Sequence, residues 1–487
     1  MKKAERFSQT CLEGLRRAQA LRPELVSNRD RTLALYNELL TAASASNALA
    51  GLMSEVHPDE VIRDAGRECE QEVARFYSEL ALDRDVFDAL AAVDVAGADA
   101  DTQRFIAHTL RDYRRAGVDK PPETRARLKE IDEALTKLGQ QFSKNISEDV
   151  RAIEIPASRL DGLPPDYVAS HPEKKGKVRI TTDYPDYNPF MTYANDDEAR
   201  KELYIAFRSR GDRQNEQVLR DILALRAEKA TLLGYADWAD YITADKMIGS
   251  GTRAAEFLEK VWNLAAPRAT RDYDELLREL QKRIPGSTTV ADWQKVWLEN
   301  LVKKEVYEVD ASQTRQYFPY ERVLGGLLEI TAEIFDLHYV PVSGPPADAM
   351  VWHPSVLVYD VARHGETLGR IYLDMHPRDG KYKHAAQFPL KDGVRGVQLP
   401  EGVLVCNFPS DAPALMEHDD VVTMFHEFGH LMHHVLGGHQ KWITQSGVAT
   451  EWDFVEAPSQ MFEEWAWSYD TLARFARHYE TGELIPP

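Results

Sequence analysis

The stretch VVTMFHEFGHLMHH, residues 421–434, is the strongest structural and chemical signal in the chain. It contains the spacing H-E-x-x-H, with histidines at positions 426 and 430. On a helix, residues at i and i+4 lie on one face about one turn apart, so His426 and His430 can bind one metal ion together. Glu427 lies about 100° further round the helix, where its carboxylate can reach a water on that ion and act as a general base.

An apolar stripe on the opposite side of this helix predicts that the helix is anchored in a core. The stripe consists of Val421, Phe425, Phe428, Met432 and Val435. Composition alone produces H-E-x-x-H in on the order of one chain in a few dozen of this size. The motif therefore needs a third ligand before it indicates a metal site.

A catalytic zinc ion normally takes three protein ligands and leaves a further position to water. The pattern H-E-x-x-H-x-x-G-x-x-H is excluded, because His433 and Leu436 stand where it requires glycine and histidine. The other arrangement takes a glutamate from a second helix downstream, and the spacing of Glu451 and Glu456 fits it equally well. The segment EWDFVEAPSQMFEEWAWSYD, residues 451–470, is predicted to be that helix.

Context favours Glu456 as the third ligand. Asp453, Ser459 and Gln460 are spaced to share its helix face and could orient its carboxylate. An acid at position 451 is explained by capping of the helix start alone.

Three further histidines follow the motif. His433 lies on the metal side of the helix but roughly 10 Å along the axis from His426, so we interpret it as a polar neighbour. His434 and His439 are interpreted as ordinary surface histidines, with His439 in a loop.

Composition restricts the class of protein. The chain has 487 residues, of which 43% are hydrophobic, and its net charge is −20. This charge disfavours nucleic acid and anionic membranes as partners, and no apolar run is long enough to span a bilayer. The N-terminus lacks the apolar region of a secretory signal. Cys11, Cys69 and Cys406 are few, odd in number and far apart, which argues against a disulfide and predicts a reduced, cytoplasmic setting.

Periodicity divides the chain into a largely helical region, residues 1–340, and a region that contains the metal motif, residues 341–487. Residues 177–182 alternate like a strand within the first region. The sequence VSGPPAD at 342–348 is a plausible seam. No period indicates a repeat architecture.

A small sheet is predicted just before the metal motif. Residues 356–361 and 367–373 read as a hairpin around the glycine of ARHGE, and residues 403–408 as another strand. The fold class is therefore mostly α with a small β-sheet.

The segments FHEFGHLMHH (425–434) and DFVEAPSQMFEEW (453–465) together resemble the thimet oligopeptidase family, which includes neurolysin, oligopeptidase A and related peptidyl-dipeptidases. Supporting stretches are YLDMHPRDGKYKHAAQ (372–387) and LVCNFP (404–409). The resemblance runs over the whole chain.

This resemblance implies one Zn²⁺ ion on His426, His430 and Glu456, with Glu427 as the general base. It implies two helical domains flanking a deep channel, with a zincin-like catalytic core. Short unstructured peptides would be the substrates, in a zinc metalloendopeptidase. The strand at residues 403–408 is similar to the family's edge strand, which holds substrate by backbone pairing.

The family continues beyond the point where this chain stops, so we expect the C-terminal part of the family fold to be missing. In the family that part carries a histidine and tyrosines on a loop that binds substrate, and its loss would expose apolar surface. One alternative is therefore a catalytically impaired peptide-binding helical protein or fragment. A second alternative is a peptidyl-dipeptidase, which keeps the chemistry and changes how the substrate terminus is held. The sequence leaves the oligomeric state open.

Overall fold

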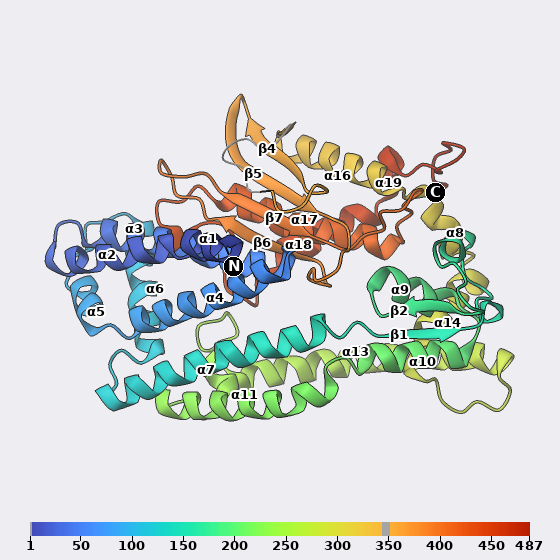
Figure 1. Cartoon of the computed structure of the whole chain (residues 1–487), viewed down its shortest axis with the longest axis horizontal. Helices are drawn as coiled ribbons and strands as arrows, with labels where there is room; N and C mark the ends of the chain where they lie inside the picture. The colour runs from blue at the N-terminus through green and yellow to red at the C-terminus, as the bar shows by residue number, and fades with distance from the viewer. Residues whose placement is uncertain (1, 343–350) are drawn as a thin grey trace.

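The structure is a computed structural model that describes residues 2–342 and 351–487. The chain is mostly helical with a small sheet near the metal motif, as predicted (Figure 1). Most of the predicted seam at 342–348 lies outside the described residues.

A bundle of helices forms the first part of the chain, as the periodicity predicts. The helices are α1 (Lys2–Cys11), α2 (Glu13–Ser27), α3 (Thr32–Val56), α4 (Glu60–Ala81), α5 (Arg84–Ala91), α6 (Ala100–Ala116) and α7 (Pro122–Ser147). Local signals set their starts: the Asp59 side chain accepts the main-chain N–H of Val61 at 3.1 Å before α4, and Pro121 and Pro122 open α7.

A disulfide links Cys11, at the end of α1, to Cys69 in α4. The prediction that the chain has no disulfide is therefore wrong, and the predicted reduced setting loses its main support. Packing of α1 against α4 brings together two cysteines that are separated by 58 residues. Cys406 is free and buried.

The middle of the chain begins with two short antiparallel strands, β1 (Ala152–Ile155) and β2 (Val178–Thr181), so the strand predicted at 177–182 is confirmed. Helices then dominate. They are α8 (Pro165–Ser170), α9 (Tyr184–Tyr193), α10 (Asp197–Arg208), α11 (Asp212–Leu233), α12 (Trp238–Thr243), α13 (Gly251–Arg283), α14 (Asp292–Val306), α15 (Ala311–Thr314) and α16 (Tyr320–Phe335), with short 3₁₀ turns at Ala157–Arg159 and Arg315–Tyr317. Several large apolar side chains of α13 are exposed, among them Trp262 and Leu264.

A five-stranded sheet precedes the metal motif in the sequence. Its strands are β3 (His338–Pro341), β4 (Leu357–Arg363), β5 (Glu366–Asp374), β6 (Ala386–Lys391) and β7 (Glu401–Val405), in the order β3-β4-β5-β7-β6. Among the strands of the described residues, β5 and β7 form the one parallel pair. The predicted hairpin is confirmed as β4–β5, and its turn contains His364 and Gly365 with φ of 51° and 82°, which suits a type I′ turn.

The edge strand is β6, not β7. We predicted residues 403–408 as an edge strand, but β7 lies between β5 and β6 and pairs with both. No described strand pairs with the other side of β6. Pro389 within β6 agrees with this position, because proline cannot donate to a ladder and is found on edge strands.

The C-terminal region returns to helices, α17 (His418–Gly437), α18 (Glu456–Glu463) and α19 (Tyr469–Phe475), with 3₁₀ turns at Ile443–Gln445 and Glu464–Trp467. The predicted apolar stripe of α17 is confirmed, since all five of its side chains are at most 1% exposed. It packs against β5 and β7 and against α16 in one core.

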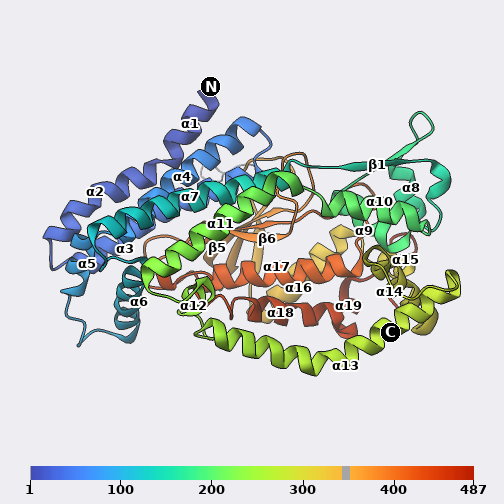
Figure 2. The same ribbon diagram turned by 90° about the horizontal axis from the view of Figure 1, so that it is seen from below.

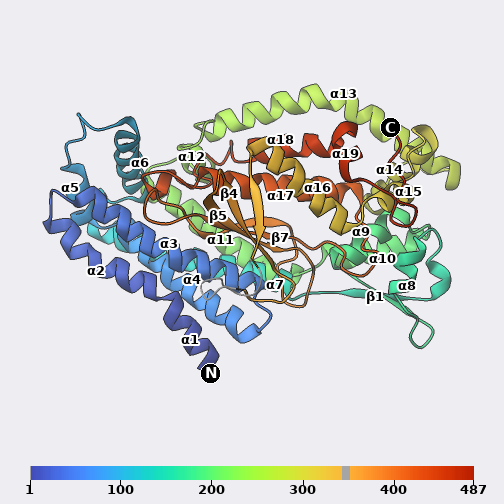
Figure 3. The same ribbon diagram turned by 90° about the horizontal axis from the view of Figure 1, so that it is seen from above.

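Two layers are visible in Figure 1, with α7, α11 and α13 below and the sheet and α17 above. Seen from below, α17 and α18 lie between α11 and α13 (Figure 2). Seen from above, strands β4, β5 and β7 lie over α17 (Figure 3).

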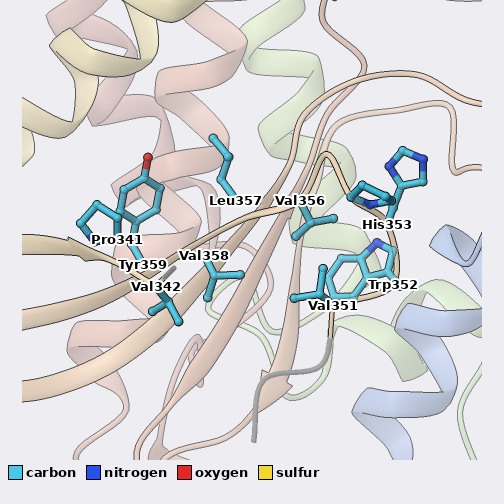
Figure 4. Close-up of a pocket in the computed structure, with 10 residues that line it drawn as sticks. Pro341, Val342, Val351, Trp352, His353, Val356, Leu357, Val358 and Tyr359 are labelled. Atoms are coloured by element: carbon cyan, nitrogen blue, oxygen red, sulfur yellow. The ribbon is translucent and has the colours of Figure 1, made fainter. Parts of the chain in front are cut away.

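A pocket of about 500 Å³ opens beside β3 and β4 (Figure 4). Its lining includes Val342, Trp352, His353 and Val358, and none of the described residues that line it carries a carboxylate. It is therefore separate from the metal motif.

Among the helices of residues 2–342 and 351–487, none combines the length and apolarity that a bilayer crossing requires.

Replacing Cys69 with serine should lower the midpoint of urea unfolding. The disulfide closes a long loop, and restricting such a loop in the unfolded chain contributes about 3–4 kcal/mol. The same measurement on the wild-type chain with a reductant should reproduce the shift. An unchanged midpoint in both experiments would show that this link does not stabilise the fold.

Candidate metal centre

Helix α17 places the two motif histidines on one face, one turn apart. The ring centroids of His426 and His430 are 5.0 Å apart and the rings are nearly perpendicular. Their side chains are 22% and 12% exposed, so both rings are partly sheltered but still open to solvent. Burial lowers the pKa of His430, which favours the neutral imidazole that a metal ion needs.

Glu456 is the first residue of α18 and completes the cluster. Its Oε2 lies 3.1 Å from Nε2 of His426 and 3.0 Å from Nε2 of His430. The three candidate ligand atoms all lie within 4.8 Å of one another. Two imidazole nitrogens and one carboxylate oxygen form the donor set of a catalytic zinc site with a fourth position left open. The residues therefore fit a zinc ion.

Glu451 does not join this cluster. It lies in the loop before α18, where its carboxylate is 3.8 Å from Arg104. The predicted helix over residues 451–470 starts only at Glu456, so position 451 is not a helix cap. Of the two glutamates that the spacing allowed, the structure brings only Glu456 to the histidines.

A close approach between α17 and α18 makes this geometry possible. Gly429 of the motif faces α18, and a Cβ at that position would lie 2.8 Å from Cα of Ser459. Any larger residue would push the two helices apart. The glycine of HEFGH thus sets the distance between the histidines and Glu456.

The groups that hold Glu456 differ in part from the prediction. The Ser459 hydroxyl donates to Glu456 Oε2 at 2.7 Å, as predicted. Asp453 does not orient Glu456. It accepts the main-chain N–H groups of Met247 and Ile248 at 3.1 and 2.9 Å, and so ties the loop before α18 to the α12–α13 connection. Gln460 is exposed.

Glu463 is a site residue that the sequence analysis missed. Its Oε1 lies 2.6 Å from Nδ1 of His426, on the side of the ring away from Glu456. A carboxylate on the second nitrogen of a histidine fixes the ring orientation and directs the other nitrogen to a metal. The signal was present, because Glu463 lies seven residues after Glu456 and so two helical turns along the same face.

Glu427 lies beside the cluster and against the edge strand. Burial is the main reason that its pKa is raised, and the carboxylate of Glu456 raises it further, while His426 and the main chain of Gln387 oppose the rise. A carboxylate therefore stands between the metal cluster and β6.

The environments of the other three histidines agree only in part with the prediction. His433 is partly buried and outside the cluster, and its Nδ1 has no hydrogen-bond partner among the described residues. His434 is only 1% exposed, so its interpretation as a surface histidine is wrong. His439 lies after the end of α17, as predicted.

The loop before β6 is anchored by a buried lysine. Lys381 Nζ donates to the carbonyl oxygens of Asp374, His376 and Cys406 at 2.8, 2.7 and 2.6 Å, and pairs with the Asp374 carboxylate. Burial lowers the pKa of Lys381 to about 8. Sequence patterns gave no sign of this unit, which fixes the path of the chain into the edge strand.

The profile of peptidase family M3 matches residues 190–487. The chain belongs to peptidase family M3. The predicted resemblance to the thimet oligopeptidases is thereby confirmed.

Similar curated proteins are oligopeptidases. A thimet-like oligopeptidase of Dictyostelium discoideum is 32% identical over 460 residues, which cover 88% of this chain and 67% of that protein. Saccharolysin of Saccharomyces cerevisiae is 31% identical over 466 residues, covering 89% and 65%. Oligopeptidase A of Escherichia coli is 32% identical over 415 residues, covering 79% and 59%. This M3 chain thus spans about two thirds or less of the length of these relatives.

The fold agrees with that of a solved structure. PZ peptidase A with inhibitor 2 superposes with a TM-score of 0.54 at 12% sequence identity, covering 98% of this M3 chain and 69% of that one. At this identity the likeness concerns the fold alone.

Replacing Gly429 with alanine should weaken zinc binding by about 10–100-fold, the range seen when groups that orient ligands are disturbed. The added Cβ would move α18, and Glu456 with it. The control is Gly325→Ala in α16, where a Cβ meets nothing within 4 Å. Competition against a fluorescent zinc chelator measures both affinities. Equal affinities in a folded Gly429→Ala protein would contradict the proposed role of this close approach.

Proposed function

We propose that this M3 family member is a zinc metalloendopeptidase that hydrolyses short unstructured peptides. The convergence of His426, His430 and Glu456 within 4.8 Å carries this proposal. Zinc is favoured over calcium or magnesium, because imidazole ligands suit transition metals and zinc.

Each residue of the site has a separate role in the proposed reaction. When bound, zinc would polarise the scissile carbonyl and lower the pKa of a water toward neutrality. Glu427 accepts a proton from the attacking water and delivers it to the nitrogen of the leaving amine. Glu463 holds the ring of His426 through Nδ1. Ser459 holds the carboxylate of Glu456.

The outer edge of β6, which pairs with no described strand, suits an extended peptide. The main chain of Gln387 in β6 lies close enough to Glu427 to lower the pKa of its carboxyl group. A peptide that adds to this edge as a further strand receives main-chain hydrogen bonds and lies beside Glu427. Such pairing requires an unfolded backbone, which favours short peptides over folded proteins. We further propose that the lower helical layer forms the opposite wall of the channel that receives them.

Cleavage of a short quenched fluorescent peptide by this 487-residue chain tests the proposal. We expect cleavage that a chelator stops and zinc restores. Glu427→Gln should keep the metal and lose about 10²–10⁴-fold in rate, the usual contribution of a general base. Glu451→Gln is the matched control and should cleave like the wild type.

The remaining outcomes discriminate between functions. Cleavage that survives the chelator, or an active Glu427→Gln variant, would contradict the mechanism. Peptide binding without cleavage in a zinc-loaded chain would favour the catalytically impaired peptide-binding protein. Products released two residues at a time would favour a peptidyl-dipeptidase.

A further inference from the structure

His434 connects the metal helix to the end of the edge strand. Its Nε2 lies 3.1 Å from the carbonyl oxygens of both Lys391 and Glu401. These two residues face each other as the last pair of β6 and β7. Since both partners are acceptors, Nε2 must carry the proton and donate to them. His434 lies one turn beyond His430 on α17, so one helix holds both a candidate metal ligand and the donor that fastens β6.

The surroundings are shaped to admit this ring. A Cβ at Gly402 of β7 would lie 2.6 Å from Leu431 and 3.1 Å from the ring of His434. A Cβ at Gly447 would lie 2.8 Å from Nδ1 of His434, and Gly447 has a positive φ of 69°. Two glycines thus let the strands and the returning loop close around a side chain that is 1% exposed. Burial lowers the pKa of His434, which keeps the ring neutral with a single N–H.

The opposite end of β6 is fastened in a similar way. The side-chain amide of Asn407, two residues after β7, donates to the carbonyl oxygens of Tyr382 and His384 at 3.0 and 2.9 Å. Between the two ends, β6 runs past α17 on the side of Glu427. The edge strand is therefore held at both ends, by His434 of α17 at one end and by Asn407 at the other.

We propose that His434 is a positioning residue, which sets how far the edge strand lies from the metal helix and hence where a peptide paired to β6 meets Glu427. This inference rests on the proposed function. An ordinary buried histidine would satisfy its nitrogen on any nearby acceptor. His434 instead bonds the two carbonyls that close the β6–β7 pair, from the helix that contains His426, Glu427 and His430. A shift of about 1 Å in such a contact can cost about 10²-fold in rate.

Three variants separate positioning from simple stabilisation. His434→Leu removes the N–H donor and fills the same space with an apolar side chain. His434→Gln keeps an N–H donor there. Val435→Ala, at the next position of α17, removes two methyl groups from the core at a residue that is 0% exposed, and so destabilises the helix packing without removing a donor to β6.

Hydrogen exchange and peptide kinetics are measured on each full-length variant loaded with zinc. We expect His434→Leu to accelerate exchange selectively in residues 386–391, to bind zinc like the wild type, and to lose about 10²-fold in kcat/KM on a peptide that spans the edge. His434→Gln should restore most of the wild-type exchange protection in residues 386–391 and most of the wild-type kcat/KM. Val435→Ala should accelerate exchange along α17 without selectivity for β6.

Three results would overturn the inference: wild-type exchange at β6 in a folded His434→Leu protein, no recovery in His434→Gln, or a loss in Val435→Ala of the same pattern and size. If the wild-type chain cleaves no peptide, the proposed function fails on its own. The exchange comparison still decides whether His434 holds the edge strand.

Discussion

The candidate site depends on one close contact, the approach of α18 to α17 at Gly429. A glycine between the two histidines leaves no Cβ to hold the helices apart, and Cα of Ser459 occupies the space. Everything at the metal cluster follows from this approach. Glu456 reaches both imidazoles, Ser459 reaches Glu456, and Glu463 reaches the far nitrogen of His426. The buried stripe on the opposite face of α17 supplies the core against which the contact is made.

The sheet adds a second constraint to the same helix. Strand β7 packs on α17, and a Cβ at its Gly402 would lie 2.6 Å from the Leu431 side chain of that helix. This contact carries β6 to the side of Glu427 and leaves its outer edge without a described partner strand. The metal cluster, the carboxylate and the edge strand are therefore fixed relative to one helix. The buried Lys381 fixes the incoming loop, and the N-terminal bundle supports that loop through a hydrogen bond from the N–H of Tyr382 to the carbonyl of Glu55 at 2.7 Å.

Local patterns were sufficient for the helices and for the core of the site. Residues spaced along one helix, such as His426, Glu427 and His430, have relative positions that the helix itself determines. The apolar stripe and the β4–β5 hairpin are local in the same sense. Glu456 required one assumption beyond spacing, that α18 returns across α17.

Contacts between distant segments were beyond the reach of such patterns. Asp453 bonds residues of the α12–α13 connection, more than two hundred positions earlier in the chain. His434 was assigned to the surface because nothing near it in sequence shows that Lys391 and Glu401 cover it. The family resemblance placed the edge strand at residues 403–408, whereas strand order depends on the parallel pairing of β5 with β7, which local patterns do not reveal. The Cys11–Cys69 disulfide was missed for the same reason, since only the packing of α1 on α4 brings the two cysteines together.

X-ray absorption spectroscopy at the zinc edge of the zinc-loaded chain tests the assignment of the three metal ligands. We expect two imidazole ligands together with oxygen at about 2.0–2.2 Å and no sulfur. The spectrum of Glu456→Gln should differ in the oxygen shell alone. A sulfur shell at about 2.3 Å, or a site with fewer than two imidazoles, would contradict the assignment of His426, His430 and Glu456 as the metal ligands.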